Sequence, residues 1–254
     1  MPGMVVAATV MRAASCPTMA GPLVLLHGFT QTRHSWRPVI AALDGRTRTV
    51  APDLPGHGSA AARPASFPAC VGYVRALGGE RFSLCGYSMG GRIALAAALA
   101  LAPRVQRLVL VGASPGLTDP TERAARRAAD AALAERIEAI GVEAFASEWG
   151  AQPLFAGQPP QVAAAAHADR LRNTPAGLAS ALRGLGTGVM EPLWGRLAEL
   201  AIPVTLVAGA RDEKFRAVAG RMAQALPRAR VEIVDGAGHA VQLERPDTVA
   251  ELLC

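Results

Sequence analysis

Cysteine is scarce in this chain of 254 residues, and its spacing matches neither a zinc site nor a redox motif. The cysteines are Cys16, Cys70, Cys85 and Cys254. Free thiols in a reducing compartment are the simplest interpretation, which predicts a cytoplasmic protein. The other residues show no pattern typical of a metal site, and no cofactor is expected.

Long apolar runs are also missing. None approaches the ~20 residues that a transmembrane helix requires, so no membrane span is expected. Residues 1–15 are mildly apolar, but they lack a positively charged start and are interrupted by Arg12. We therefore predict an edge strand there rather than a signal peptide.

Lysine and aromatic residues are rare as well. Lys214 is the only lysine among 26 basic residues, and aromatic residues make up 4% of the chain. The net charge of +6 comes largely from arginines that are scattered along the sequence. Nucleic-acid binders cluster their basic residues, so this pattern argues against a nucleic-acid partner. We expect a small-molecule partner, and the sequence leaves both a monomer and a homodimer open.

The chain does contain a repeated alternation of short apolar runs and helix-forming stretches. Runs of four or five apolar residues that end in small residues are typical of parallel strands buried on both faces. Such strands are predicted within residues 22–28, 47–58, 81–88, 105–114, 202–212 and 230–239. Helices are predicted at residues 35–43, 68–79, 89–103, 215–227 and 245–254. This alternation predicts an α/β fold with a doubly wound, mainly parallel sheet.

One long interval breaks the alternation. Between residues 118 and 200 no strand is predicted, and helix-forming stretches at 121–141 and 176–186 flank a proline-broken segment at 149–161. Because a strand precedes this interval and another follows it, we predict a helical lid, residues 118–200, inserted into a core formed by residues 1–117 and 201–254. A separate helical domain is the alternative.

A serine lies between two glycines in the stretch GYSMG, residues 86–90. Glycine and serine are common, so the string alone is a weak signal. Here it follows the apolar run RFSLC and opens a helix-forming stretch, which is the arrangement of a nucleophile elbow. Ser88 is therefore the candidate nucleophile, and a plain helix-capping serine is the alternative.

An activated serine needs a base and an acid that orients the base. On this fold the expected chain order is serine, acid, histidine. His239 follows the last predicted strand and is the candidate base, whereas His167 falls within the predicted lid. Asp212 is the candidate acid because it follows the strand before; Glu213 and Asp235 are its rivals.

Two backbone amides must also converge to form an oxyanion hole. One is expected from Met89, which follows the serine, and the other from Phe29 in the loop after the first predicted strand. His27 in that loop and His57 in the stretch DLPGHG are interpreted as structural residues that brace loops.

These motifs together resemble the α/β-hydrolase superfamily, in which LHGF, DLPGHG, GYSMGG, GARD and GAGH occur in that order. Further segments narrow the resemblance to one family within it. These are GYSMGGR, SPGL, EWGAQPLF, RLRNTPAGLASALR, PLW and RDEKF. They are similar to the 2-succinyl-6-hydroxy-2,4-cyclohexadiene-1-carboxylate synthases of menaquinone biosynthesis, the MenH family, over nearly the whole chain.

The resemblance implies a carbon–oxygen lyase. The family eliminates pyruvate from 2-succinyl-5-enolpyruvyl-6-hydroxy-3-cyclohexene-1-carboxylate after a proton α to a carbonyl is removed. Ser88 would relay that proton to His239 while Asp212 holds the imidazole, and no acyl-enzyme would form. A carboxylesterase or a carbon–carbon-bond hydrolase of the same fold is the alternative, and a non-catalytic binding protein is a third.

The family's substrate carries three carboxylates, which guanidinium groups bind as bidentate donors. By the resemblance, Arg92, Arg126 and Arg172 match the binding positions. Tyr87 and Trp149 match further positions of the site, and Phe155 is expected to line the pocket. For Arg126 a solvated helix face is the alternative. Arg92 lies one helical turn after the candidate nucleophile, which keeps it near the pocket.

Overall fold

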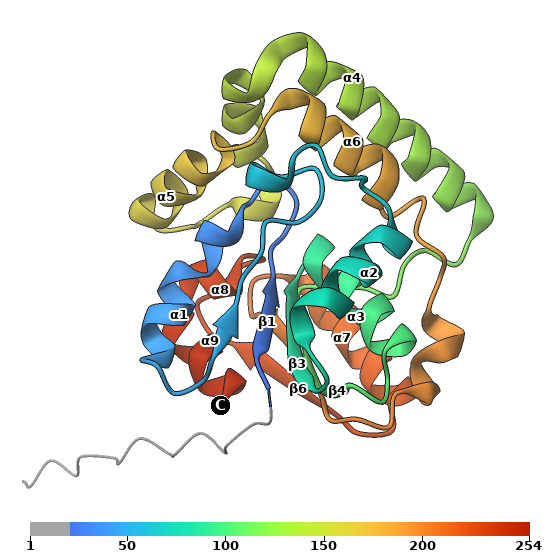
Figure 1. Cartoon of the computed structure of the whole chain (residues 1–254). Helices are drawn as coiled ribbons and strands as arrows, with labels where there is room; N and C mark the ends of the chain where they lie inside the picture. Colours follow the sequence, from blue (N-terminus) through green and yellow to red (C-terminus); the bar gives the residue numbers. More distant parts are fainter. Residues whose placement is uncertain (1–20) are drawn as a thin grey trace, which may run out of the picture.

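The computed structural model describes residues 21–254, so the predicted edge strand at residues 1–15 and Cys16 lie outside the described residues. Figure 1 shows a sheet with helices on both sides and a group of helices lying across one end of it. The predicted α/β class and the doubly wound arrangement are confirmed.

All the predicted strands of residues 21–254 are present in one six-stranded sheet of order β2-β1-β3-β4-β5-β6. They are β1 (Leu23–Leu26), β2 (Thr49–Val50), β3 (Phe82–Tyr87), β4 (Val105–Val111), β5 (Val204–Gly209) and β6 (Ala229–Val234). Every neighbouring pair is parallel. Every residue of β1, β3 and β5 is buried, because helices cover both faces of the sheet.

The two faces of the sheet have separate hydrophobic cores. On one face lie α2 (Phe67–Gly78), α3 (Met89–Ala100) and α7 (Glu213–Ala225). On the other lie α1 (Arg37–Leu43), α8 (Val241–Glu244) and α9 (Pro246–Leu253). Short 3-10 helices connect elements at Arg33–Trp36, Gly58–Ala60, Pro153–Phe155 and Trp194–Glu199.

The helical insertion, residues 118–200, lies between β4 and β5 and contains no strand. It is built from α4 (Pro120–Gly150), α5 (Pro160–Arg170) and α6 (Pro175–Leu185). The α4 segment is interrupted at Gly141, whose φ of 80° and ψ of 170° are not helical. Helices α4 and α6 share an apolar cluster that includes Ile137, Phe145 and Leu178, and Phe29 of the core packs against it. The insertion is thereby attached over the carboxyl end of the sheet (Figure 1).

Sequence analysis missed α5, because its start coincides with the proline-broken segment. Pro159 is its N-cap and Pro160 its first residue, a position where the missing amide hydrogen costs no helical hydrogen bond.

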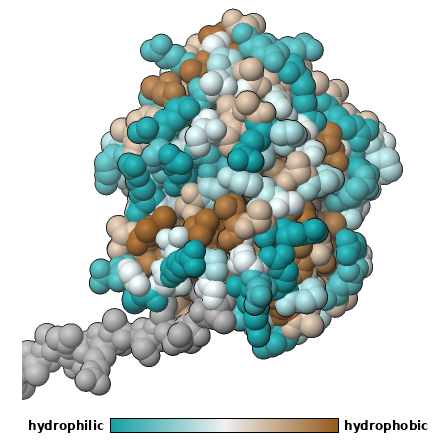
Figure 2. All heavy atoms as spheres, viewed as in Figure 1, coloured by the Kyte–Doolittle hydropathy of each residue, from teal (hydrophilic) through white to brown (hydrophobic). Residues whose placement is uncertain are grey.

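On the face shown in Figure 2, apolar side chains gather at the level where the insertion meets the core. None of the helices in residues 21–254 has the length and apolar composition that crossing a bilayer requires.

Cys70 and Cys85 are buried free thiols, and burial raises the pKa of both. Cys254 is disulfide-bonded, so the expectation of a free thiol is wrong at that residue. The spacing of cysteines along a chain does not show which of them are bonded.

The close approach of β1 and α3 requires a glycine. A Cβ atom at Gly90 would overlap the carbonyl oxygens of Leu26 and His27, whereas a Cβ atom at Gly72 in α2 would meet nothing within 4 Å. We expect Gly90→Ala to lower the free energy of unfolding by about 2 kcal/mol through overpacking. Gly72→Ala should raise it by about 0.5–1 kcal/mol, because alanine is the better helix former.

Urea denaturation of both variants checks this expectation. Both substitutions add one methyl group within a helix. A change in the free energy of unfolding that has opposite sign in the two variants therefore reports the packing of α3 against β1. Equal effects would show that α3 does not depend on close contact with β1.

Candidate active site

Ser88 lies in the tight turn between β3 and α3. Its φ of 50° and ψ of −109° are unusual for a residue with a side chain, which marks local backbone strain. The Ser88 amide donates to the Val111 carbonyl oxygen at 2.9 Å, and this bond attaches the turn to the neighbouring strand β4. Sheet and helix together thus hold the Ser88 side chain at the carboxyl end of the strands.

A chain of hydrogen bonds joins Ser88 to two further side chains. Its Oγ lies 3.3 Å from Nε2 of His239, and Nδ1 of His239 lies 2.6 Å from Oδ2 of Asp212. His239 follows β6 and Asp212 follows β5, and both are buried. The other carboxylate oxygen of Asp212 accepts from the Phe215 amide at 3.2 Å, which fixes its orientation as the N-cap of α7.

The rival residues named from the sequence lie elsewhere. The side chains of Glu213 and Asp235 are exposed, although each is close in sequence to a member of this chain of hydrogen bonds. His167 lies on α5 and does not line the pocket around Ser88.

The two histidines interpreted from the sequence as structural, His27 and His57, make hydrogen bonds to loop backbone. Nε2 of His27 accepts from the Leu54 amide at 2.9 Å, and Nδ1 of His57 donates to the Pro55 carbonyl oxygen at 3.1 Å. Both rings are completely buried. Burial lowers the pKa of His57 to about 3 and also lowers that of His27, so both rings are neutral at physiological pH.

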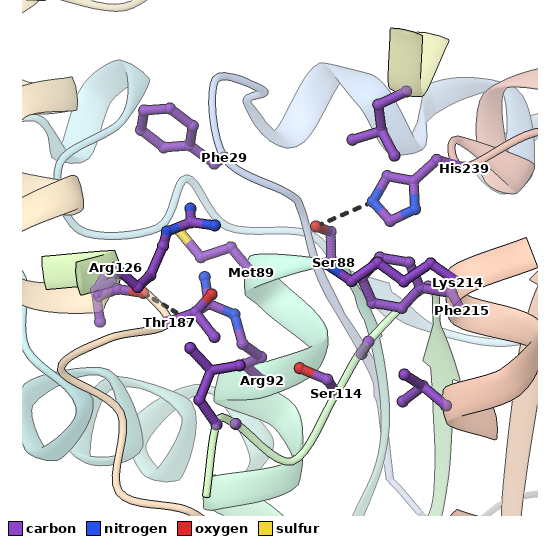
Figure 3. A pocket seen from close by; sticks show the side chains of 18 of the residues that line it. Phe29, Ser88, Met89, Arg92, Ser114, Arg126, Thr187, Lys214, Phe215 and His239 are labelled. Carbon is purple, nitrogen blue, oxygen red and sulfur yellow. Dashed lines mark hydrogen bonds between the residues drawn. The ribbon is translucent and has the colours of Figure 1, made fainter. Parts of the chain in front are cut away.

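Phe29 and Met89 both line the cavity that contains Ser88 (Figure 3). Met89 is the first residue of α3, so its amide has no acceptor within that helix. Phe29 comes from the loop after β1, which Gly28 brings against the ring of Tyr87. Both residues therefore border the cavity that contains the serine, and their role as an oxyanion hole stays a prediction.

The cavity has a volume of about 380 Å³, which suits a small molecule. Ser88 and His239 lie on its core side, and Trp149, Leu154 and Leu182 of the insertion contribute to its wall. In residues 21–254 no group of three or more His, Cys, Asp or Glu side chains is arranged to hold a metal ion.

Positive charge dominates the lining of this cavity. Its cationic residues are Arg92 from α3, Arg126 from α4, and Lys214 and Arg221 from α7, against the single carboxylate of Glu122. Arg92 donates from Nη1 to the Leu185 carbonyl oxygen at 2.6 Å. Burial lowers the pKa of Arg92 to about 10, which leaves it charged at neutral pH. Such a lining favours an anionic ligand.

Sequence analysis did not identify Asp130, which orients one of these cations. Its Oδ1 accepts from Nε of Arg126 at 2.8 Å, one turn along α4. Asp130 is buried between α4 and α6, where burial raises its pKa against the opposing effect of the two pocket arginines. Because this bond uses Nε, it leaves the terminal nitrogens of Arg126, a residue that lines the cavity, for other partners.

Arg172 does not line the cavity. Its side chain is 51% exposed, and its Nε lies 3.8 Å from Asp169. Arg170, two residues earlier, is buried instead, and its guanidinium lies 5.2 Å from the ring centroid of Phe155. Burial lowers the pKa of Arg170, while Tyr87 and Asp169 raise it. The position of Arg170 could not be predicted from the sequence, because the helix that carries it, α5, was not predicted.

Two of the aromatic residues named from the sequence, Trp149 and Phe155, belong to one cluster, whereas Tyr87 packs against His239. Trp149 lines the cavity, with its ring 5.3 Å from that of Phe29 and 6.5 Å from that of Phe155. Tyr87 is buried, with its ring 5.2 Å from that of His239. Phe155 and Tyr87 stand behind the surface of the cavity rather than on it.

Comparisons with known proteins agree with this geometry. Residues 23–252 match the model of the alpha/beta hydrolase family. A 2-succinyl-6-hydroxy-2,4-cyclohexadiene-1-carboxylate synthase from Salmonella typhimurium is 36% identical over 240 residues, covering 91% of this chain and 93% of the relative.

Two solved structures are similar over most of their length. The structure of MenH from S. aureus superposes with a TM-score of 0.85 at 31% identity, covering 92% of this chain and 91% of that one. A thermophilic esterase from Thermogutta terrifontis superposes with a TM-score of 0.78 at 26% identity, covering 92% of this chain and 88% of that one.

Proposed function

Since the chain belongs to the alpha/beta hydrolase family, and its 36% identical relative is a synthase of that fold, we propose the corresponding activity for it. The protein is a 2-succinyl-6-hydroxy-2,4-cyclohexadiene-1-carboxylate synthase, a carbon–oxygen lyase of menaquinone biosynthesis. It eliminates pyruvate from 2-succinyl-5-enolpyruvyl-6-hydroxy-3-cyclohexene-1-carboxylate. The observation that carries this proposal is the cationic cavity around the serine, with Arg92 and Arg126 on its wall.

The hydrogen-bonded chain acts as a base. Ser88 transfers its proton to Nε2 of His239 as its oxygen takes the proton α to the substrate ketone, and Asp212 stabilises the imidazolium that results. The electron pair of the broken C–H bond moves toward the ketone oxygen. The amides of Phe29 and Met89 donate to this oxyanion, and each such donor contributes about 3 kcal/mol to stabilising the transition state.

The same electron pair then expels the leaving group. It forms a C=C bond between C2 and C3 of the ring, the pair of the existing C3=C4 bond shifts to C4–C5, and the C5–O bond breaks. The enolpyruvyl group departs as enolpyruvate and becomes pyruvate once its carbon is protonated. No water is added, so the reaction needs a closed cavity rather than access for a nucleophilic water. We propose that the helical insertion serves as the lid that provides this closure.

The arginines bind carboxylates of the substrate. Arg92 and Arg126 reach the cavity from the core and from the insertion, so they hold the substrate at the junction of the two. The Asp130 carboxylate keeps Arg126 in place before the substrate arrives. A small tricarboxylate substrate, a cytoplasmic location and either a monomer or a homodimer belong to this proposal.

Of the arginines in RLRN, we propose that Arg170 rather than Arg172 supports the site. Arg170→Met should lower kcat/KM about tenfold, because it removes a buried charge that packs on Phe155 close to Tyr87. Arg172→Met should change it less than about twofold, since the side chain is exposed. Steady-state kinetics of both variants shows which arginine supports the site. A larger loss of kcat/KM in Arg172→Met than in Arg170→Met would assign that role to Arg172 instead.

The activity itself is tested by supplying the enolpyruvyl precursor and following pyruvate by coupling to lactate dehydrogenase. We expect pyruvate and the cyclohexadiene product in equal amounts. When the reaction runs in H₂¹⁸O for a time too short for ketone exchange, neither product should contain ¹⁸O. Pyruvate release at the uncatalysed rate would refute the proposal.

A carboxylesterase is the second candidate, and the similarity to the thermophilic esterase favours it. An esterase would hydrolyse neutral p-nitrophenyl esters rapidly, and it would not depend on Arg92. The cationic lining of the cavity argues against this candidate, because a neutral ester has no charge for those groups to bind.

A further inference from the structure

The single lysine of the chain lies in the cavity that contains Ser88. The chain has 26 lysine and arginine residues, and all of them except Lys214 are arginines. Lys214 is in the first turn of α7, and it lines the cavity together with Val218 and Arg221 on the same face of that helix. A chain that otherwise uses arginine throughout thus places its one ammonium group at the candidate site.

Lys214 approaches the serine from the side opposite the arginines. Figure 3 shows Lys214 and Phe215 on the His239 side of Ser88, with Arg92 and Arg126 on the other side. The Phe215 ring lies 4.7 Å from the His239 ring, and Nζ of Lys214 lies 5.7 Å from the centroid of the same Phe215 ring. The ammonium of this exposed residue therefore lies on the same side of the cavity as His239.

No carboxylate within the described residues 21–254 forms an ion pair with this ammonium. The oxygens of nearby Asp212 are occupied by His239 and by the Phe215 amide. A cation in a cavity without an internal counterion is available to an anionic ligand.

We infer that Lys214 binds a carboxylate of the substrate on the α7 side of the cavity, across the serine from Arg92 and Arg126. This inference rests on the proposed function, because the substrate there carries three carboxylates and Arg172 lies outside the cavity. A lysine suits this position because its ammonium is compact and donates in three directions.

Kinetics with the enolpyruvyl precursor tests the inference. Lys214→Gln should raise KM about tenfold and change kcat less than about threefold, since the bond is made in the ground state and the transition state alike. Lys214→Arg should recover part of the loss because it keeps the charge. Arg216→Gln is the matched control: it removes one positive charge from the same helix, where its guanidinium contacts the Ala210 carbonyl oxygen outside the cavity.

Chemical labelling gives a second readout that does not depend on turnover. Because Lys214 is the only lysine, 2,4,6-trinitrobenzenesulfonate can modify no amine in the protein except Lys214 and the N-terminus. We expect the cyclohexadiene product and pyruvate, added together at saturating concentration so that all three carboxylates are present, to slow labelling of Lys214 at least about fivefold, measured by peptide mass spectrometry, and to leave labelling of the N-terminus unchanged.

The outcomes separate the two proposals. If wild-type protein releases pyruvate while Lys214→Gln has a KM within twofold of wild type and the two products together do not protect Lys214, the inference is overturned and the proposed function stands. If wild-type protein releases no pyruvate, the proposed function fails first. A raised KM in Lys214→Gln that Arg216→Gln reproduces would also overturn the inference, because the effect would then be one of general charge.

Discussion

Ser88→Ala is expected to lower the rate of pyruvate release about a thousandfold or more, the largest effect of any single substitution considered. The hydroxyl lies between the substrate and Nε2 of His239, so its removal interrupts the path of the proton. Residual catalysis should come from the amides of Phe29 and Met89 and from the cationic lining, which the substitution leaves in place. Single-turnover measurements isolate this step when the enzyme is in excess over the precursor and its concentration is above the dissociation constant.

The control for Ser88→Ala is its folding. The residue keeps a Cβ and the same strained backbone, so thermal unfolding should occur within a few degrees of the wild-type transition. Retention of activity within tenfold of wild type would show that His239 removes the proton directly and that the serine has no part in it.

Arg92→Ala is expected to lower kcat/KM for the precursor about a hundredfold, equivalent to about 3 kcal/mol. Removing one partner of a desolvated charge pair typically costs 2–5 kcal/mol. Arg92 is suited to such a pair because burial has already displaced much of its water, and its bond to the Leu185 carbonyl oxygen fixes its direction. The loss should be specific to the anionic substrate.

Arg183→Ala is the matched control for this substitution. Arg183 lies on α6 and pairs with Glu138 on the surface, where exposed ion pairs contribute little. We expect kcat/KM within twofold of wild type for Arg183→Ala. If Arg92→Ala lowers kcat/KM no more than Arg183→Ala does, Arg92 does not bind a carboxylate of the substrate.

Much of this architecture could be predicted because the physical signals are local. The strands β1, β3 and β5 are buried on both faces. Such burial favours apolar runs, which can be recognised in the sequence. The placement of Ser88 follows from the same signals, since a glycine-flanked serine between a strand and a helix has few other conformations available. The chain order of Asp212 and His239 follows from the order of the strands.

What could not be predicted depends on contacts between distant segments. Arg170 and Arg172 are alike in sequence, and only the register of α5 against the core determines which is buried. Asp130 pairs with Arg126 on its own helix, but its burial depends on the end of α6 at Gly186, which lies against it from a later part of the chain. Lys214 was visible as a single lysine, but its position in the cavity depends on the direction in which α7 leaves Asp212.

The central claim is that this site is built for an anionic elimination substrate rather than for a neutral ester. The most direct test is the ratio of kcat/KM for the enolpyruvyl precursor to kcat/KM for p-nitrophenyl acetate, measured with the same preparation. A site whose polar groups are matched to its substrate discriminates strongly against an analogue that lacks the matching groups. We predict a ratio of at least about a thousand. A ratio below one, with ester hydrolysis unaffected by Arg92→Ala, would contradict the account.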